Sequence, residues 1–255
     1  MKGNDSDDRA ISGRRKTGPA VEPRRGRRPI SLPVPRPGRG KSLHAAFAAR
    51  GTDRAISGKK LSPQMLSNLL WSACGINRKV GPIAGKGRTA ASASNAQEID
   101  VYVATAEGVS LYDPVGNRLL PVVDEDLRAL AIGRGQNGMG AQAPVRLIYA
   151  VDLERLASAP FQEPGLKDPE TQKAYYFVDT GLIAGNVYLF AASRGLAAWF
   201  HNCDKEALGR KLGLRKGQRI LFAQTVGYKG EGMAPGAVRP AIRPSTGKRS
   251  SKRVP

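Results

Sequence analysis

One long helical segment, Thr171 to Arg194, constrains the fold more than any other part of the sequence. From Phe177 onward it is apolar nearly all round, and a helix of that kind must be covered on both sides. Gly181 and Gly185 lie four positions apart, so they would let another helix approach closely. Polar side chains interrupt the run, and no window reaches the roughly 18–20 apolar residues of a membrane span. We therefore expect a buried central or dimer-interface helix and no membrane partner.

The net charge is +20, and most of the excess lies at the two ends of the chain. Residues 1–40 carry a net charge of +7, and residues 229–255 carry +6. Both ends are poor in large apolar side chains, so they cannot bury enough surface to offset the entropy lost on ordering. We expect a disordered basic N-terminal tail over residues 1–28 and one folded domain over residues 29–229. The basic C-terminal extension, residues 230–255, is expected to be partly ordered at most.

The basic ends leave two interpretations open. They are solvated charge runs, or they attract RNA, DNA or anionic lipid weakly and in a salt-sensitive way. A dedicated nucleic-acid-binding protein would interleave aromatic side chains with its cations for base stacking. Residues 1–40 and residues 229–255 contain no Phe, Tyr or Trp. The sequence thus favours, at most, a weak and nonspecific nucleic-acid contact.

The cysteines and the N-terminal sequence give information on the cellular compartment of the protein. Cys74 and Cys203 do not make a disulfide framework, and no Cys/His cluster has the spacing of a zinc site. We expect both cysteines to be packing residues in a reducing cytoplasm. The twin arginines at Arg14–Arg15 and Arg24–Arg25 are not followed by an apolar stretch of signal length. The sequence therefore predicts a cytoplasmic protein without a bound metal.

The remaining apolar patterns predict a domain in which helices and strands are mixed. Helices are expected over Ser42–Ala49, Ser62–Gly75, Asp124–Ala131, Thr171–Arg194 and Asp204–Leu212. Strands are expected over Ile99–Thr105, Val109–Tyr112, Arg118–Val123, Val145–Val151 and Arg219–Tyr228. Prolines make Ile30–Pro35 an extended arm. Because helices and strands do not alternate strictly, the predicted fold class is α+β, with one sheet and helices packed on it.

Arg50, Thr52 and Arg54 form the first motif with chemical meaning. Two guanidinium groups and a hydroxyl at alternate positions of an extended segment point the same way. Guanidinium groups match phosphate oxygens in bidentate geometry, so the motif predicts a phosphate clamp. By itself, the same pattern also fits a solvated charge run.

The segment from Ser92 to Gln97 is the second motif, and it is dense in small and amide side chains. Small residues let a backbone approach a flat ring, and Asn or Gln can bond to the carbonyl and N–H groups of that ring. Taken alone, the segment is better interpreted as an ordinary polar loop.

In their order and spacing, these motifs resemble the nitroreductase family of FMN enzymes. Ala46–Leu70 resembles the opening of that family, where an Arg-x-Ser-x-Arg/Lys motif precedes a Leu-rich helix ending in Trp; here that helix is Leu61–Trp71. Further similar segments are Arg88–Ile99 with its Ser-Ala-x-Asn-x-Gln element, Gly181–Leu196 with the long helix and flavin-side loop, and Ile220–Tyr228 with the last core strand. Val109–Asp113 and Pro121–Val123 look like the SagB-type branch, whose members include azoline dehydrogenases.

The resemblance implies a nitroreductase-like fold, a central mixed or antiparallel sheet flanked by helices, in an intertwined homodimer. It also implies roles for individual residues. Positions that would bind the phosphate, the ribityl chain and the pyrimidine edge of FMN are Arg50, Thr52 and Arg54. Positions that would come from the second subunit and line the ring are Ser92, Ala93, Asn95 and Gln97. Positions that would lie by the isoalloxazine face are Gly195, Leu196 and Ala197. Arg239, with Arg243 next, would meet the phosphate, and Gln136 would touch flavin or substrate.

The implied activity is that of an FMN-dependent oxidoreductase. Two electrons would pass by a ping-pong mechanism from NAD(P)H to a small-molecule acceptor such as a nitro compound or a quinone. Azoline dehydrogenation of a peptide substrate, in the manner of the SagB-type branch, stays open as an alternative. A basic nucleic-acid-binding protein and a degenerate, non-catalytic protein of the flavin fold are further alternatives. No acid–base catalytic residue is evident from the sequence.

Three positions depart from the pattern of the family. Thr52 stands where Ser is usual, which keeps the hydroxyl, and Ala91 stands where Pro is usual. Azoline-oxidising relatives tend to carry an adjacent Lys-Tyr pair ahead of the central helix. Here Ala174 separates Lys173 from Tyr175.

Overall fold

The computed structural model describes residues 26–231 except 37, 39, 82, 84, 134–135, 137–139 and 141. Most of the two basic ends, and Arg239 and Arg243 with them, lie outside the described residues. The boundaries expected at residues 28 and 229 stay predictions.

The described chain forms one seven-stranded sheet, in which every pair of neighbouring strands is antiparallel. Its strands are β1 (Ile30–Ser31), β4 (Ile99–Thr105), β5 (Gly108–Asp113), β6 (Arg118–Val123), β7 (Val145–Asp152), β8 (Leu196–His201) and β9 (Gln218–Tyr228). They lie in the order β1-β6-β5-β4-β7-β9-β8. A separate pair consists of β2 (Ile76–Arg78) and β3 (Gly87–Arg88). The predicted α+β class is therefore confirmed, and the sheet, expected to be mixed or antiparallel, is antiparallel.

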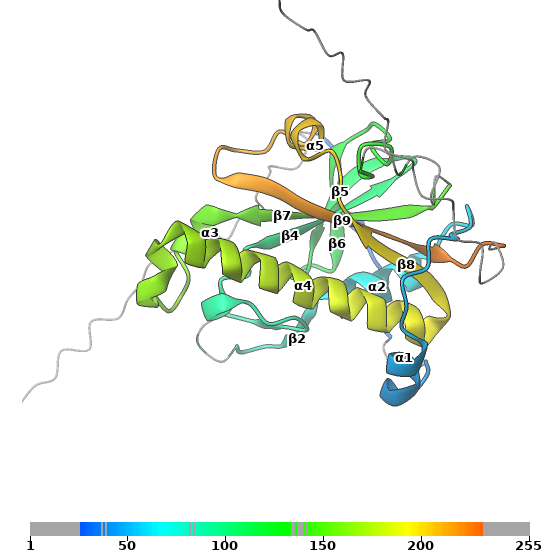
Figure 1. Cartoon of the computed structure of the whole chain (residues 1–255), viewed down its shortest axis with the longest axis horizontal. Coiled ribbons are helices and arrows are strands. Elements are labelled where there is room, and N and C mark those ends of the chain that lie inside the picture. The colour runs from blue at the N-terminus through cyan, green and yellow to red at the C-terminus, as the bar shows by residue number, and fades with distance from the viewer. Residues whose placement is uncertain are drawn as a thin grey trace, which may run out of the picture.

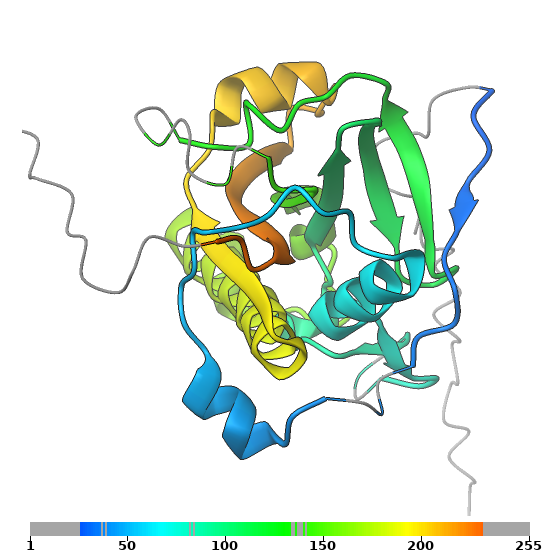
Figure 2. The ribbon, with the colours of Figure 1, turned by 90° about the vertical axis from the view of Figure 1, so that its right-hand side faces the viewer.

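Helices cover both faces of this sheet (Figure 1, Figure 2). They are α1 (Leu43–Ala49), α2 (Pro63–Cys74), α3 (Leu153–Ala157), α4 (Pro169–Arg194) and α5 (Lys205–Lys211), with short 3-10 turns at Ala93–Asn95 and Pro164–Lys167. Helices α2 and α4 pack on one face, and α5 packs on the other. Strand β7 is buried along its whole length, because Leu147 and Tyr149 point to the α2–α4 side while Ile148 and Ala150 point to the α5 side.

The ends of the helices follow the capping residues. Ser62 accepts a hydrogen bond from Met65 N–H at the start of α2, and Pro63 occupies the first helical position. Asp168 caps α4 in the same way, so this helix begins two residues earlier than the apolar pattern predicts. At its other end, Gly195 adopts a left-handed conformation with φ of 67°, which stops the helix and turns the chain back toward the sheet.

The helix expected over Asp124–Ala131 is not formed; this segment is a series of bends and turns. The Asp126 carboxylate accepts hydrogen bonds from the backbone N–H and the guanidinium of Arg128, a local pairing that competes with helical hydrogen bonds. The buried Arg146 side chain then donates to the carbonyl oxygen of Arg128. The helix prediction was therefore wrong because side-chain bonds replaced the backbone ladder.

The loop expected after the long helix is also different, because Leu196 and Ala197 begin strand β8 and pair with β9. Ile30–Ser31 of the expected arm pairs with β6 before the first proline of that arm is reached. Among the described residues, no helix is long and apolar enough to cross a membrane.

Candidate active site

The segment that follows α1 crosses the end of α4 and the edge formed by β8 and β9. Asp53 N–H donates to the carbonyl oxygen of Ala198 at 2.9 Å, and Ser57 N–H donates to that of Tyr228 at 2.9 Å. Ile56 pairs with Lys229 as an isolated bridge. These backbone contacts hold residues 50–56 extended, with the side chains of Arg50, Thr52 and Arg54 exposed.

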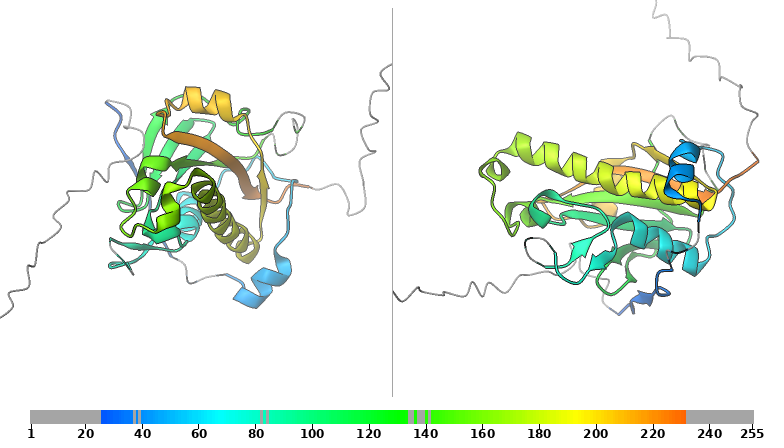
Figure 3. Two further views of the ribbon diagram at one scale, coloured as in Figure 1. Left: turned by 60° about the vertical axis from the view of Figure 1, so that its left-hand side comes forward. Right: turned by 90° about the horizontal axis from the view of Figure 1, so that it is seen from below.

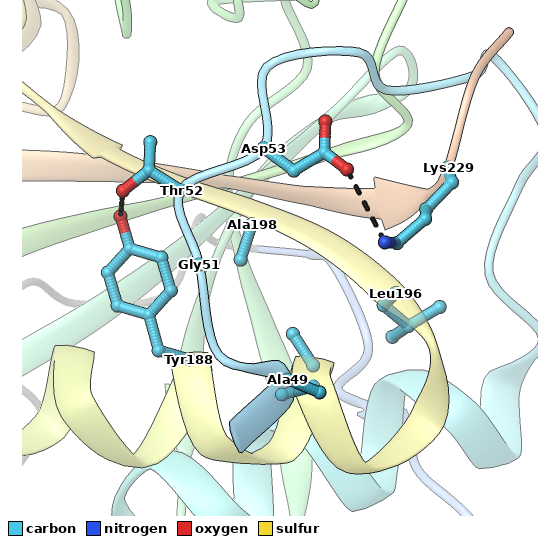
Figure 4. Close-up of a pocket in the computed structure, with 10 residues that line it drawn as sticks. Ala49, Gly51, Thr52, Asp53, Tyr188, Leu196, Ala198 and Lys229 are labelled. Carbon is cyan, nitrogen blue, oxygen red and sulfur yellow. Dashed lines mark hydrogen bonds and ion pairs between the residues drawn. The ribbon is translucent and has the colours of Figure 1, made fainter. Parts of the chain in front are cut away.

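A cavity of about 200 Å³ opens between this segment, α4 and β8 (Figure 4). Its lining consists of small side chains with a few polar groups: Ala49, Gly51, Thr52, Asp53, Tyr188, Ala191, Ala192, Leu196, Ala198 and Lys229. At its rim, the ammonium group of Lys229 lies 3.7 Å from the carboxylate of Asp53. Pockets for drug-sized ligands are usually of about 300–1,000 Å³, so this cavity can take only part of such a molecule.

Tyr188 connects the candidate site to the sheet. Its hydroxyl accepts a hydrogen bond from Phe200 N–H at 2.8 Å and lies 3.1 Å from the hydroxyl of Thr52. The guanidinium of Arg50 lies 5.7 Å from the centre of the same ring, within the range of a cation–π contact. One side chain of α4 thus supports two members of the predicted clamp.

Arg54, the third member, contacts another ring. Its guanidinium lies 5.3 Å from the centre of the Trp199 ring, on strand β8. Successive residues of a strand point to opposite faces, so Trp199 points away from the face that carries Ala198 and the cavity. The structure brings Arg50 and Thr52 together at Tyr188 but places Arg54 at a neighbouring ring, so the three side chains do not all point one way.

The second predicted segment, Ser92–Gln97, is held in an unusual backbone conformation. Ser94, Asn95 and Gln97 all have positive φ angles, of 48°, 54° and 54°. Such conformations cost on the order of 1 kcal/mol or more for a residue with a side chain, and they cluster at functional sites. Internal hydrogen bonds maintain the loop, from Gln97 N–H to the Ser92 hydroxyl and from the Gln97 amide to Asn95 Oδ1.

Within one chain, the two predicted groups of residues do not meet. The first group contacts α4 at Tyr188, whereas Ala93 of the second group contacts it at Asp179 through a 2.8 Å hydrogen bond. Nine helical residues separate these two anchor points, which corresponds to about 14 Å along the helix axis. Ser92 and Gln97 instead border a small cavity of about 10 Å³ beside Cys74 and Arg88.

The other predicted positions are scattered around the first cavity. Leu196 lines it, and Gly195 lies exposed at the end of α4. Ala197 is fully buried and packs with Ile56 and Ala143, so its side chain does not reach the cavity. Gln136 bonds through its N–H to the carbonyl oxygen of Gly133, and its side-chain Oε1 is buried without a hydrogen-bond partner among the described residues.

Three polar residues that line the cavity were missed by the sequence patterns: Asp53, Tyr188 and Lys229. Asp53 lies inside the Arg50–Arg54 motif, and its position there was an available signal. Tyr188 is part of a helix that is apolar nearly all round, so its hydroxyl did not stand out from packing residues.

His201 lies beyond Trp199 on the same strand, and the two rings contact each other at a tilt of 46° with their centres 4.3 Å apart. One ring nitrogen is 2.9 Å from the carbonyl oxygen of Asn202, and the other is 2.8 Å from the hydroxyl of Thr225. Burial lowers the pKa of His201 to about 4. The imidazole is therefore neutral near pH 7 and is not a ready proton donor. No group of acidic, His and Cys residues in the described part of the chain could hold a metal ion.

Comparisons with known proteins agree with this fold. Residues 47–228 match the family model described as Nitroreductase family. A protein of Methanocaldococcus jannaschii, provisionally named a nitroreductase, is 28% identical over 178 residues, which is 65% of this chain and 83% of that protein. A crystal structure from Ralstonia eutropha JMP134, also provisionally named a nitroreductase, is 29% identical with a TM-score of 0.71. It covers 81% of this chain and 91% of its own.

A chain of the Escherichia coli microcin synthetase McbBCD complex, solved with truncated pro-MccB17 bound, shares the fold at 17% identity and a TM-score of 0.57, covering 77% of each chain. The family model spans more than half of the chain, from the end of α1 to the end of β9. The chain therefore belongs to the nitroreductase family.

Proposed function

We propose that this protein is an FMN-dependent oxidoreductase that transfers two electrons from NAD(P)H to a small-molecule acceptor. The observation that carries the proposal is the cavity beside Tyr188, in a chain that belongs to the nitroreductase family. FMN consists of a flat ring, a polar ribityl chain and a phosphate. The walls of this cavity match those parts chemically, with small side chains for the ring, and the Thr52 hydroxyl and the Lys229 ammonium for the chain and phosphate.

Among the residues of this chain, Arg50 and Lys229 would supply positive charge at the cavity rim. The hydroxyl of Thr52 would accept or donate a hydrogen bond, and Leu196 would contact the apolar ring. When bound, FMN supplies the two-electron carrier that NAD(P)H reduces and an acceptor reoxidises in turn. The protein supplies positioning, positive charge and a partly dry surface.

The cavity of one chain is too small for the whole cofactor, and this supports a shared site in a homodimer. Helix α4 runs along the surface of the domain, as both views in Figure 3 show. Its outer side carries exposed apolar residues: Phe177 is 36% exposed, Val178 58% and Leu182 44%. Gly181 lies between them, and an added Cβ there would meet open space. A second copy of α4 packed on this stripe would bury it, and the Ser92–Gln97 segment of that copy would complete the cavity.

A second candidate within the family is azoline dehydrogenation, as in the SagB-type branch. Its support is the shared fold of the microcin synthetase chain. The adjacent Lys-Tyr pair expected for that activity is interrupted here by Ala174, and both side chains are engaged with acids. Tyr175 donates its hydroxyl proton to Glu163 at 2.8 Å, and Lys173 lies 3.5 Å from the carboxylate of Glu170. We therefore place reduction of a nitro compound or quinone first.

The test is a steady-state assay on the FMN-loaded protein. With NADH or NADPH as donor and a nitroaromatic compound or a quinone as acceptor, we expect parallel lines in double-reciprocal plots, the pattern of a ping-pong mechanism. An azoline-containing peptide tests the alternative activity: it would replace NAD(P)H as the electron donor, because its ring loses two electrons on conversion to the azole. A protein that neither retains FMN nor oxidises NAD(P)H when FMN is added in excess would refute the proposal.

A further inference from the structure

Two acidic side chains meet in the interior beneath the Ser92–Gln97 loop. Glu98 is the residue just before β4, and its side chain is fully buried. Asp179 extends from α4 and is 4% exposed. Their carboxyl groups are within hydrogen-bonding distance of each other. Among the described residues, no other residue donates an N–H or O–H group to either oxygen of Glu98.

The cations nearby are directed elsewhere. Arg155 forms a 2.6 Å ion pair with Asp100, and it reaches Glu98 through the backbone carbonyl oxygen. Arg88, on β3, is half-buried, and its Nε has no hydrogen-bond partner among the described residues. Its charge interacts with Asp100 and Cys74 as well as with Glu98. No ammonium or guanidinium group in the described residues therefore bonds to the Glu98 carboxyl group.

Two ionised carboxylates cannot share a site of this kind, because each would lose its hydration and repel the other. Burial and the neighbouring Asp179 raise the pKa of Glu98 from its ordinary 4.5 to about 8. Burial also raises the pKa of Asp179, while its bonds with Glu98 and with the N–H of Ala93 act in the opposite direction. One proton between the two groups gives one of the Glu98 oxygens a partner, since the protonated oxygen becomes a donor to the Asp179 carboxylate.

The ionised partner has a second bond, and that bond fixes the loop. Asp179 Oδ2 accepts the N–H of Ala93 at 2.8 Å, immediately before the first of the positive-φ residues. Another acid, Glu163, accepts a hydrogen bond from the hydroxyl of Ser94 at 3.0 Å. The loop therefore depends on acceptors from outside its own sequence to keep a conformation that costs energy.

We propose that Glu98 and Asp179 are positioning residues that share one proton, with Glu98 donating to Asp179 so that the Asp179 carboxylate can hold Ala93 and the Ser92–Gln97 loop in place. The consequence for FMN rests on the proposed function, because the loop would line the flavin ring of the partner copy.

The pair makes the loop sensitive to alkaline pH. A carboxyl group with a raised pKa in the folded state contributes stability that is full below its ordinary value and is lost as pH rises toward the folded value. Here that window runs from about pH 4.5 to about pH 8. Above it, the second negative charge would separate the two side chains and release Ala93. FMN affinity should then fall by up to about tenfold per pH unit.

The experiment measures FMN affinity of the full chain by quenching of flavin fluorescence, between about pH 6.5 and about pH 9.5. Wild-type protein should lose affinity by more than about tenfold across this range. Glu98→Gln keeps a neutral donor but cannot titrate, so its affinity should stay nearly constant. Asp179→Asn leaves a single acid facing an amide, and its decline should also disappear. Glu206→Gln, an exposed acid on α5, should retain the wild-type decline.

A Glu98→Gln or Asp179→Asn profile that declines as steeply as wild type would overturn the proposal, as would a flat wild-type profile. The flavin-free protein gives an independent reading. Its unfolding temperature should fall with rising pH in wild type, and should fall less in Glu98→Gln. If no FMN binds at any pH while this difference in unfolding persists, the proposed function fails and the shared proton stands.

Discussion

Replacing Gly181 with arginine is expected to give a folded monomer that no longer retains FMN. Gly181 is exposed on α4, and an added side chain would meet nothing in its own chain. Arginine is also the better helix former, by up to about 1 kcal/mol. The substitution should thus leave the single chain intact, while a long charged side chain blocks the close approach of a second α4. We expect the dimer to dissociate. We also expect the FMN affinity to fall by at least about 100-fold, or roughly 2.7 kcal/mol.

The matched control is Gly209→Arg on α5, where an added side chain also meets open space but on the opposite face of the sheet. It should remain dimeric and keep FMN. Sedimentation velocity and flavin fluorescence measure the two properties, and far-UV circular dichroism confirms the helix content. A Gly181→Arg protein that stays dimeric with wild-type FMN affinity would show that α4 is not the interface.

The double substitution of Arg50 and Arg54 by alanine should lower FMN affinity by about 100-fold or more. A hydrogen bond to a charged group contributes about 1.5–3 kcal/mol, and the guanidinium of Arg50, which lies against the cavity residue Tyr188, would make two such bonds to the phosphate in bidentate geometry. Both side chains are exposed, and their cation–π contacts with Tyr188 and Trp199 contribute only about 0.5–1 kcal/mol each. The flavin-free fold should therefore lose little stability.

Two controls separate charge from geometry. Arg210→Ala removes an exposed cation from α5, far from the cavity, and should leave FMN affinity unchanged. Arg50→Lys keeps the charge but cannot bond in a bidentate manner, and should fall between wild type and the alanine variant. Isothermal titration with FMN gives the affinities. An unchanged affinity in the double variant would remove both arginines from the binding site.

Most strands of the sheet and the main helices were predictable because short local sequence patterns indicate each of them. Ser62–Pro63 marks a helix start, and the continuous apolar run of Val145–Val151 marks a buried strand. Strand β8 was not predictable in this way. Its six residues follow Gly195 directly, and only pairing with β9 distinguishes them from a loop. The turns over Asp124–Ala131 depend on the local Asp126–Arg128 pairing and on Arg146, whose side chain reaches this segment from strand β7.

The residues of the candidate site also fall into those that a local sequence motif predicts and those that only the folded chain brings together. Arg50 and Thr52 were predictable because they belong to one short motif. Tyr188 and Lys229 were not, because they reach the cavity only after the chain has folded. The pairing of Glu98 with Asp179 is of the same kind, since 81 positions of sequence (179 − 98) separate the two acids.

The most direct test of the shared flavin site is sedimentation velocity of the FMN-loaded protein, followed by absorbance in the flavin band as well as in the protein band. We predict that flavin sediments with a species of twice the chain mass, at one FMN per chain. Flavin that sediments with a single chain, or a dimer that carries none, would contradict the claim that two copies of this chain together form the flavin site.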